Sequence, residues 1–209
     1  MVDTHLLDEC AMNLIKHLKD AEVKNLSLII KAVICCIKSH AGQKRNSGED
    51  YHTHPITVAF YVSNYSLKID VLIAALLHDT LEDTALPPQE IEQQFGARVL
   101  ELVQKLTRKI DPVTKKKYSA ASLLDIFYKD NDHDVMLIKQ CDRIHNMETI
   151  EYMSKEDKEK IFTETIQSFI PYAMCFQTNK KMEHHLLKVC GLKIPTLSFQ
   201  ESSSSLSFL

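Results

Sequence analysis

The densest group of chemically active side chains in this sequence is the run His78-Asp79-Thr80-Leu81-Glu82-Asp83. It closes residues 69–81, the most apolar stretch of the chain. Burial of imidazole and carboxylate groups is costly unless the groups are paired or bind a cation. The run therefore predicts a site that holds a metal ion or a set of paired charges.

Helical spacing determines which of these side chains meet. Residues four apart are neighbours on a helix, so His78 lies beside Glu82, and Asp79 beside Asp83. His78 and Asp79 are adjacent in sequence and reach one ion together only if a helix end or turn allows it. A lone His-Asp dipeptide is usually a surface pair, so further ligands are needed to support a metal site.

Two further candidate ligands lie elsewhere in the chain. His54 is found in the segment 51–55 (YHTHP), and Asp142 in the segment 139–147 (KQCDRIHNM). With His78 and Asp79 they make a set of imidazoles and carboxylates, which suits Mn²⁺ or Fe²⁺ better than a closed thiolate zinc site does. Such a set leaves coordination positions for a water and a phosphate oxygen.

The composition limits the classes of partner. The formal charge is −3 and the pI about 6.4, so no global basic field predicts a nucleic-acid polymer as partner, although a local site can bind a small anion. No apolar run reaches the roughly 18 residues of a membrane span. The first residues do not resemble a signal peptide, and the six cysteines form no C-x-x-C pair. These features predict a cytoplasmic protein with reduced cysteines and no membrane association.

The elements that must position these residues are helices. Strand-like alternation is almost absent, and apolar residues recur with helical spacing, which predicts an all-α, single-domain bundle over residues 1–193. Residues 111–117 are expected to form a loop, and residues 194–209, ending in SSSSLSFL, a disordered tail. The helices are expected at residues 27–40, 55–65, 69–81, 97–107, 119–129, 134–150, 157–177 and 180–190, with a short one that starts at Pro87 or Pro88 and stops at Gly96.

Four segments in this order resemble a known family. They are residues 40–55 (HAGQKRNSGEDYHTHP), 74–84 (AALLHDTLEDT), 95–96 (FG) and 137–147 (LIKQCDRIHNM). They are similar to the motifs of the HD-type hydrolase domain of the RelA/SpoT family. The C-terminal part is more similar to the short stand-alone alarmone hydrolases, and no synthetase domain follows.

The resemblance implies an activity and a site. The family hydrolyses the 3′-pyrophosphate of ppGpp or pppGpp, a small nucleotide, to GDP or GTP and pyrophosphate with Mn²⁺. By position, Arg45 matches a residue that stacks on guanine, and Lys115 lies where relatives have a lysine that closes over the substrate. Lys139 is expected to reach a phosphate or pair with a site carboxylate. The other matches are His54, His78, Asp79 and Asp142 as metal ligands, Glu82 and Asp83 as the catalytic acidic pair, and Asn146 and Thr149 around the nucleoside.

Three positions depart from the family pattern. Asn46 replaces a frequent basic residue, Asp50 a proline and Glu148 an arginine, which concerns substrate affinity rather than the metal set. Two other functions remain open from the sequence. One is an HD phosphohydrolase for another nucleotide, such as a dNTP, a nucleoside monophosphate or NADPH. The other is a degenerate domain that only binds nucleotide, against which the intact acidic pair argues. The sequence leaves the oligomeric state open.

Overall fold

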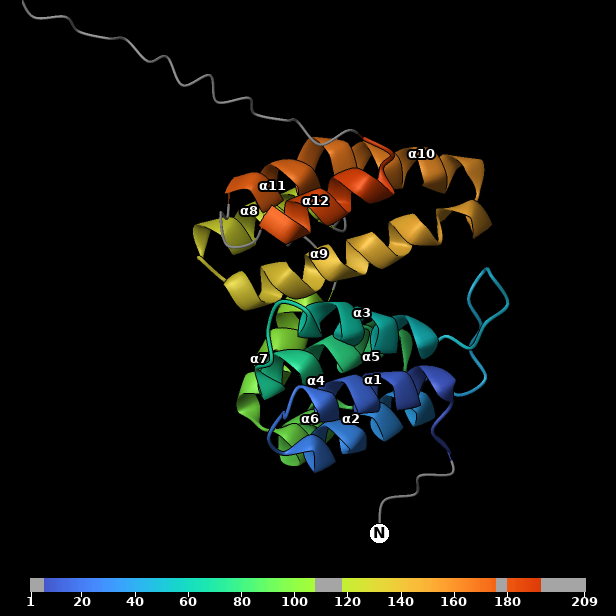
Figure 1. The fold of residues 1–209 in the computed structure, drawn as a ribbon, viewed down its shortest axis with the longest axis vertical. Helices are drawn as coiled ribbons and strands as arrows, with labels where there is room; N and C mark the ends of the chain where they lie inside the picture. Colours follow the sequence, from blue (N-terminus) through green and yellow to red (C-terminus); the bar gives the residue numbers. More distant parts are fainter. Residues whose placement is uncertain (1–5, 108–117, 176–179, 193–209) are drawn as a thin grey trace, which may run out of the picture.

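The computed structural model describes residues 6–107, 118–175 and 180–192, and over these ranges the chain is all-α (Figure 1). No strand forms there, and the one β-type pairing is a bridge between Lys44 and Asp50. No helix in this part of the chain is long and apolar enough to cross a membrane. The expected loop at 111–117 and the expected tail at 194–209 lie outside the described residues.

The helices begin and end close to the predicted boundaries. Pro88 starts the short helix and Gly96 follows its last residue, as predicted from their helix start and stop tendencies. The elements are α1 (Glu9–Asp20), α2 (Leu26–Ser39), α3 (Thr53–Ser63), α4 (Ile69–Leu77), α5 (Thr80–Asp83), α6 (Pro88–Phe95), α7 (Ala97–Leu106), α8 (Ala120–Lys129), α9 (His133–Glu148), η2 (Ile150–Tyr152), α10 (Lys155–Glu164), η3 (Thr165–Phe169), α11 (Ile170–Cys175) and α12 (Lys180–Val189).

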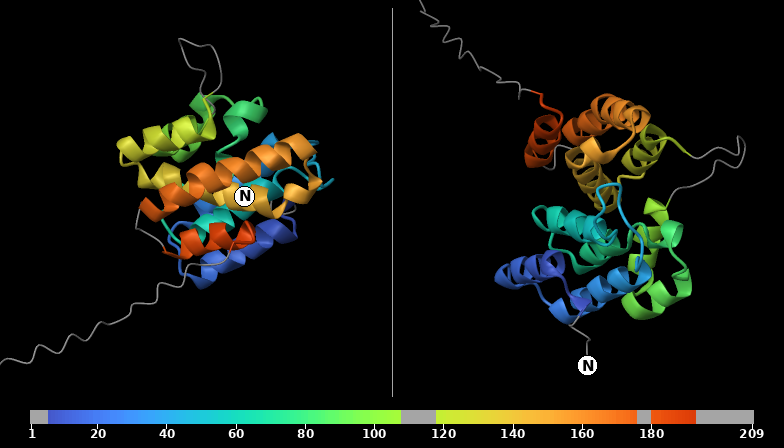
Figure 2. Two further views of the ribbon diagram at one scale, coloured as in Figure 1. Left: turned by 90° about the horizontal axis from the view of Figure 1, so that it is seen from above. Right: turned by 90° about the vertical axis from the view of Figure 1, so that its right-hand side faces the viewer.

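Helix α9 joins two groups of helices. In Figures 1 and 2 it lies between the group that contains α1–α7 and the group that contains α10–α12. It packs on α3, α4 and α7 on one side and on α8 and α12 on the other. Helix α4 lies at the centre of the first group, and its residues from Val71 to Leu77 are fully buried. A helix that is apolar all round belongs in such a core.

The helix predicted over residues 69–81 is interrupted at His78 and Asp79, where the prediction was wrong. Two side chains compete with the main chain for the carbonyl groups at this point. His78 Nδ1 lies 2.8 Å from the carbonyl oxygen of Ala75, and Thr80 Oγ1 donates to the carbonyl of Leu77 at 2.7 Å. Such local hydrogen bonds offer the backbone an alternative to the helical ladder. Helix α4 therefore ends just before the proposed ligands.

The helix predicted over residues 157–177 is also divided. It runs as α10, a π-helical turn η3 and α11, with residues 176–179 outside the described ranges. Pro171 lies two residues after the end of this turn; it has no N–H to donate, and its ring crowds the carbonyl four residues earlier. A π-helical turn accommodates such a lost hydrogen bond, so the sequence did contain the signal for the break.

Candidate metal centre and nucleotide pocket

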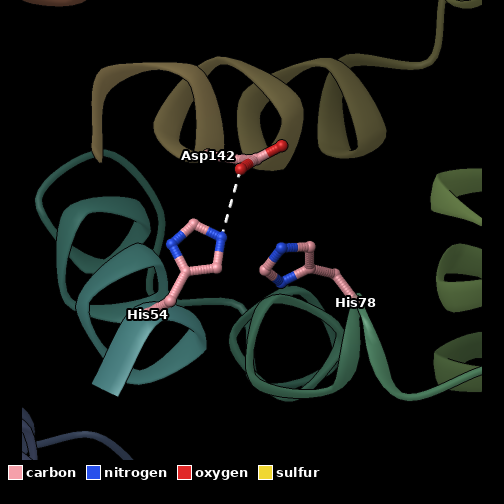
Figure 3. A group of neighbouring side chains, drawn as sticks. All are labelled: His54, His78 and Asp142. Atoms are coloured by element: carbon pink, nitrogen blue, oxygen red, sulfur yellow. Dashed lines mark ion pairs between the residues drawn. The ribbon is translucent and has the colours of Figure 1, made fainter. Parts of the chain in front are cut away.

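Three helices bring the metal-binding candidates together. His54 comes from the first turn of α3, His78 follows the last residue of α4, and Asp142 lies within α9 (Figure 3). One donor atom of each lies within 4.8 Å of the other two, and all three side chains are buried. Residues that are far apart in the sequence therefore share one small polar space in the core.

Asp79 adds a second carboxylate to this space. Its Oδ2 lies 3.2 Å from Nε2 of His78 and 3.7 Å from Nε2 of His54. The turn after α4 permits this, because His78 and Asp79 are adjacent and yet both face the centre. The side chains expected as ligands therefore converge, with two imidazole nitrogens and two carboxylates.

The donor atoms fit a cation. His78 Nδ1 donates to the carbonyl of Ala75, so the ring presents its other nitrogen, Nε2, to the centre, where this buried atom has no hydrogen-bond partner. His54 Nε2 lies 3.2 Å from Oδ1 of Asp142, and burial lowers the pKa of His54, which keeps this nitrogen unprotonated. A neutral His54 and the carboxylate oxygens suit a metal ion, for which His78 would give up its Nε2 proton.

The charges at the centre are also compatible with a bound cation. Burial alone would lower the pKa of His78, but the carboxylates of Asp79 and Asp142 outweigh it and raise this pKa to about 9. Burial works against both ionised carboxylates, yet the His78 imidazole holds the pKa of Asp79 below its usual range, and Lys139 and His54 do the same for Asp142. The two acids stay charged, and a bound cation would compensate them.

Neighbouring polar groups fix the orientation of the ligands. Asp142 accepts from Asn146 Nδ2 at 2.6 Å and from Lys139 Nζ at 2.8 Å. His54 Nδ1 lies 2.6 Å from Nδ1 of His145. Burial, together with His54 and Arg45, lowers the pKa of His145 to about 3, so His145 is neutral, and its Nδ1 can accept this hydrogen bond in the tautomer with the proton on Nε2. Partners of this kind set the tautomer and direction of metal ligands.

A cavity of about 380 Å³ opens next to the ligands, a size within the range of small-molecule sites. In its lining, Arg45 Nη2 donates to Thr149 Oγ1 at 3.0 Å, which joins two residues expected around the nucleoside. Of the acidic pair, Glu82 lines the cavity and Asp83 does not. Lys115 lies outside the described residues. Residues expected at the site that line the cavity are Arg45, His54, Asp79, Glu82, Lys139, Asp142, Asn146 and Thr149.

The sequence prediction missed several residues at this cavity. Tyr152, Met153 and Asp157 line it from the segment that follows α9, which carries none of the recognised motifs. Tyr51 also lines it, and its hydroxyl donates to Asp79 at 2.9 Å. A signal for Tyr51 was present, because it lies inside the motif between Arg45 and His54. The other three carry no signal in the sequence.

Comparison with known proteins places this geometry in a family. The family model described as HD domain matches residues 32–174, and the chain therefore belongs to the HD domain family. Two curated proteins are similar to this chain over most of its length. The GTP pyrophosphokinase rsh of Brucella ovis is 38% identical over 152 residues, which cover 71% of this chain and 20% of the relative. The bifunctional (p)ppGpp synthase/hydrolase SpoT of Escherichia coli K12 is 36% identical over 160 residues, covering 75% and 22%.

These matches confirm the predicted resemblance to the HD domain of RelA/SpoT proteins. The chain spans about a fifth of the length of the curated relatives it matches. A solved structure described as a metazoan ortholog of SpoT that hydrolyses ppGpp superimposes with a TM-score of 0.65, at 22% identity, over 78% of this chain and 93% of that one. This likeness confirms the fold.

Proposed function

We propose that this protein is a Mn²⁺-dependent hydrolase that removes the 3′-pyrophosphate of ppGpp or pppGpp, giving GDP or GTP and pyrophosphate. One observation carries the proposal. Three of the four candidate metal ligands, His54, Asp79 and Asp142, line the same cavity as the linked pair Arg45 and Thr149, and His78 lies directly behind Asp79. We call the part of the site around His54, Asp79 and Asp142 the metal end, and the part around Arg45 and Thr149 the purine end. Together they suit a nucleotide whose phosphates are the reacting group.

His54, His78, Asp79 and Asp142 would hold the ion. The set contains nitrogen and oxygen donors and no thiolate, which favours Mn²⁺ over a structural zinc. When bound, the ion supplies Lewis-acid stabilisation of negative charge on the pyrophosphate.

The described lysines that line the cavity supply little free charge for the phosphates. Among the described lysines that line the cavity, Lys44 pairs with Asp50 at 2.8 Å, and Lys139 pairs with Asp142 at 2.8 Å. Phosphate binding is therefore expected to depend strongly on the metal. Lys139 keeps Asp142 charged and oriented, and it is close enough to the cavity to contact a phosphate as well.

Glu82 is the residue proposed to manage the proton. Its carboxylate belongs to the cavity lining, and a positioned carboxylate can accept the proton of the attacking water. Asp83, the other member of the acidic pair, accepts a hydrogen bond from Tyr51 at 3.4 Å. We assign the general base to Glu82, and Asp83 keeps a supporting role in the acidic pair.

Arg45 is the residue proposed to hold the base. Its guanidinium is fixed by Thr149 at 3.0 Å and lies 3.5 Å from His145 Nδ1. A planar guanidinium held at its edge leaves its face available for stacking on a purine. Asn146, one helical turn after Asp142, also lines the cavity.

Product analysis tests the proposal. Metal-stripped protein with added Mn²⁺ is given ppGpp, pppGpp, dNTPs, a nucleoside monophosphate and NADPH in parallel, with a chelator as control. We expect GDP or GTP and pyrophosphate in equal amounts from the alarmones. A higher kcat/KM on another nucleotide would instead assign the chain as an HD phosphohydrolase of that substrate, and no turnover of any of them would contradict an enzymatic function.

A further inference from the structure

Tyr51 holds a central position that the proposed chemistry does not use. It lies just before α3, and its ring stacks on buried His40 with centroids 4.8 Å apart. His40 Nδ1 donates to the side-chain oxygen of Gln43 at 2.8 Å, and Gln43 Nε2 donates to the main-chain carbonyl of Asp83 at 2.6 Å. The segment that carries Arg45 is thus attached to α5 through Gln43, and the Tyr51 ring is fixed independently of its hydroxyl.

The Tyr51 hydroxyl faces two carboxylates. It donates to Oδ2 of Asp79 at 2.9 Å and lies 3.4 Å from Oδ2 of Asp83. The Asp79 oxygen is the same atom that lies 3.2 Å from His78 Nε2. Two carboxylates one turn apart repel each other, and a neutral donor between them relieves this. Burial and the neighbouring Asp79 raise the pKa of Tyr51, so the hydroxyl remains a donor.

We propose that Tyr51 is a positioning residue of the metal centre, which fixes the Asp79 carboxylate toward the ion and sets its distance from Asp83. The predicted effect on turnover rests on the proposed function. The predicted effect on Mn²⁺ binding requires only that the ion binds at this site. Hydrogen-bond partners behind metal ligands commonly contribute 10- to 100-fold to metal affinity or activity. Through the same hydroxyl, the geometry of the ligand and that of the acidic pair are linked.

The substitution Tyr51→Phe tests this role, because it removes one oxygen and keeps the ring that stacks on His40. The dissociation constant of Mn²⁺ is measured on the full-length, metal-stripped chain by titration calorimetry, without nucleotide. We expect Mn²⁺ to bind about 10- to 100-fold more weakly. At saturating Mn²⁺ the KM for nucleotide should stay within about twofold of wild type, because Tyr51 is not assigned to the base, while kcat falls. The metal-free Tm should fall by only about 2–4 °C, the worth of one hydrogen bond.

A matched control separates positioning from general stability. Tyr172 also donates its hydroxyl to a carboxylate, Asp125, at 3.0 Å, in a contact between α11 and α8. Tyr172→Phe should bind Mn²⁺ as the wild type does. Wild-type Mn²⁺ affinity in Tyr51→Phe, or an equal loss in Tyr172→Phe, would overturn the proposal. Since no nucleotide is present, either result is distinct from a failure to hydrolyse ppGpp.

Discussion

The two ends of the cavity are built differently. At the metal end, His54 and His78 are each 3% exposed, and the ligands are fixed by the packing of α3, α4 and α9. At the purine end, Arg45 belongs to a turn between α2 and α3, and Thr149 follows the end of α9. The core therefore fixes the proposed ligand set, whereas less constrained segments carry Arg45 and Thr149, the residues proposed to hold the nucleoside. Binding residues often lie on loops that a rigid scaffold positions.

The largest effect is expected at the metal end. His78→Ala removes the nitrogen that faces the centre, so it should abolish both Mn²⁺ binding and turnover, as a chelator does to the wild type. Metal content after dialysis and steady-state rates measure the two losses. His184→Ala, on the exposed part of α12, is the control and should keep both. Full activity in metal-free buffer would contradict a metal-dependent reaction.

A smaller loss of activity is expected from a residue that takes part in the reaction but does not bind the metal. Glu82→Gln keeps the shape of the side chain and removes the base. It should retain Mn²⁺ and bind ppGpp but turn over about 10²–10⁴-fold more slowly, the usual worth of a positioned general base. Single-turnover rates and metal analysis decide this, with Glu92→Gln on the exposed face of α6 as control. If Glu82→Gln loses the metal, Glu82 is a ligand. If it turns over at the wild-type rate, another group accepts the proton.

A substitution at the purine end should raise KM and leave the metal content unchanged. Arg45→Lys keeps the charge but loses the planar group that stacks, so KM for ppGpp should rise about tenfold with unchanged Mn²⁺ affinity. Steady-state kinetics at saturating Mn²⁺ measure this. Arg98→Lys, in a surface ion pair with Glu101, is the control. An unchanged KM would remove Arg45 from the substrate site.

The smallest effect is expected from the residue that supports Arg45. Thr149→Val keeps the β-branched shape and removes the oxygen that accepts from Arg45. One neutral partner of this kind contributes about 0.5–1.5 kcal/mol, so KM should rise about two- to tenfold. In the double variant with Arg45→Lys the two effects should not add, because both act on one interaction. Additive effects would mean that Thr149 contacts the substrate independently.

Much of this site follows from sequence because its residue types are costly to bury. His78 and Asp79 close an apolar stretch, so their types and their position alone predict a cation or a paired charge. The all-α fold follows from periodicity in the same way. The helix break at His78 does not follow, because it depends on the Ala75 and Leu77 carbonyls accepting from side chains, and the pattern of apolar residues continues through the break.

The rest of the cavity lining was harder to predict, for a physical reason. Asp157 and Tyr152 reach the cavity from exposed positions where almost any polar residue is compatible with the fold. No periodicity or burial cost identifies such residues. Pro171 shows the opposite case, since a missing N–H within a helical pattern is a definite signal, and the prediction of a continuous helix there neglected it.

Helix α4 is enclosed on every side, and the ion would sit against its last turn. The ligands cannot separate without opening the interior, so the free energy of ion binding adds to the free energy of unfolding. An ion at one hundred times its dissociation constant adds about 2.7 kcal/mol. Under the proposed function, a polypeptide deprived of the ion would therefore be inactive and would also unfold more often, which exposes it to proteases. Metal supply would then govern how long each molecule persists, alongside how fast it works.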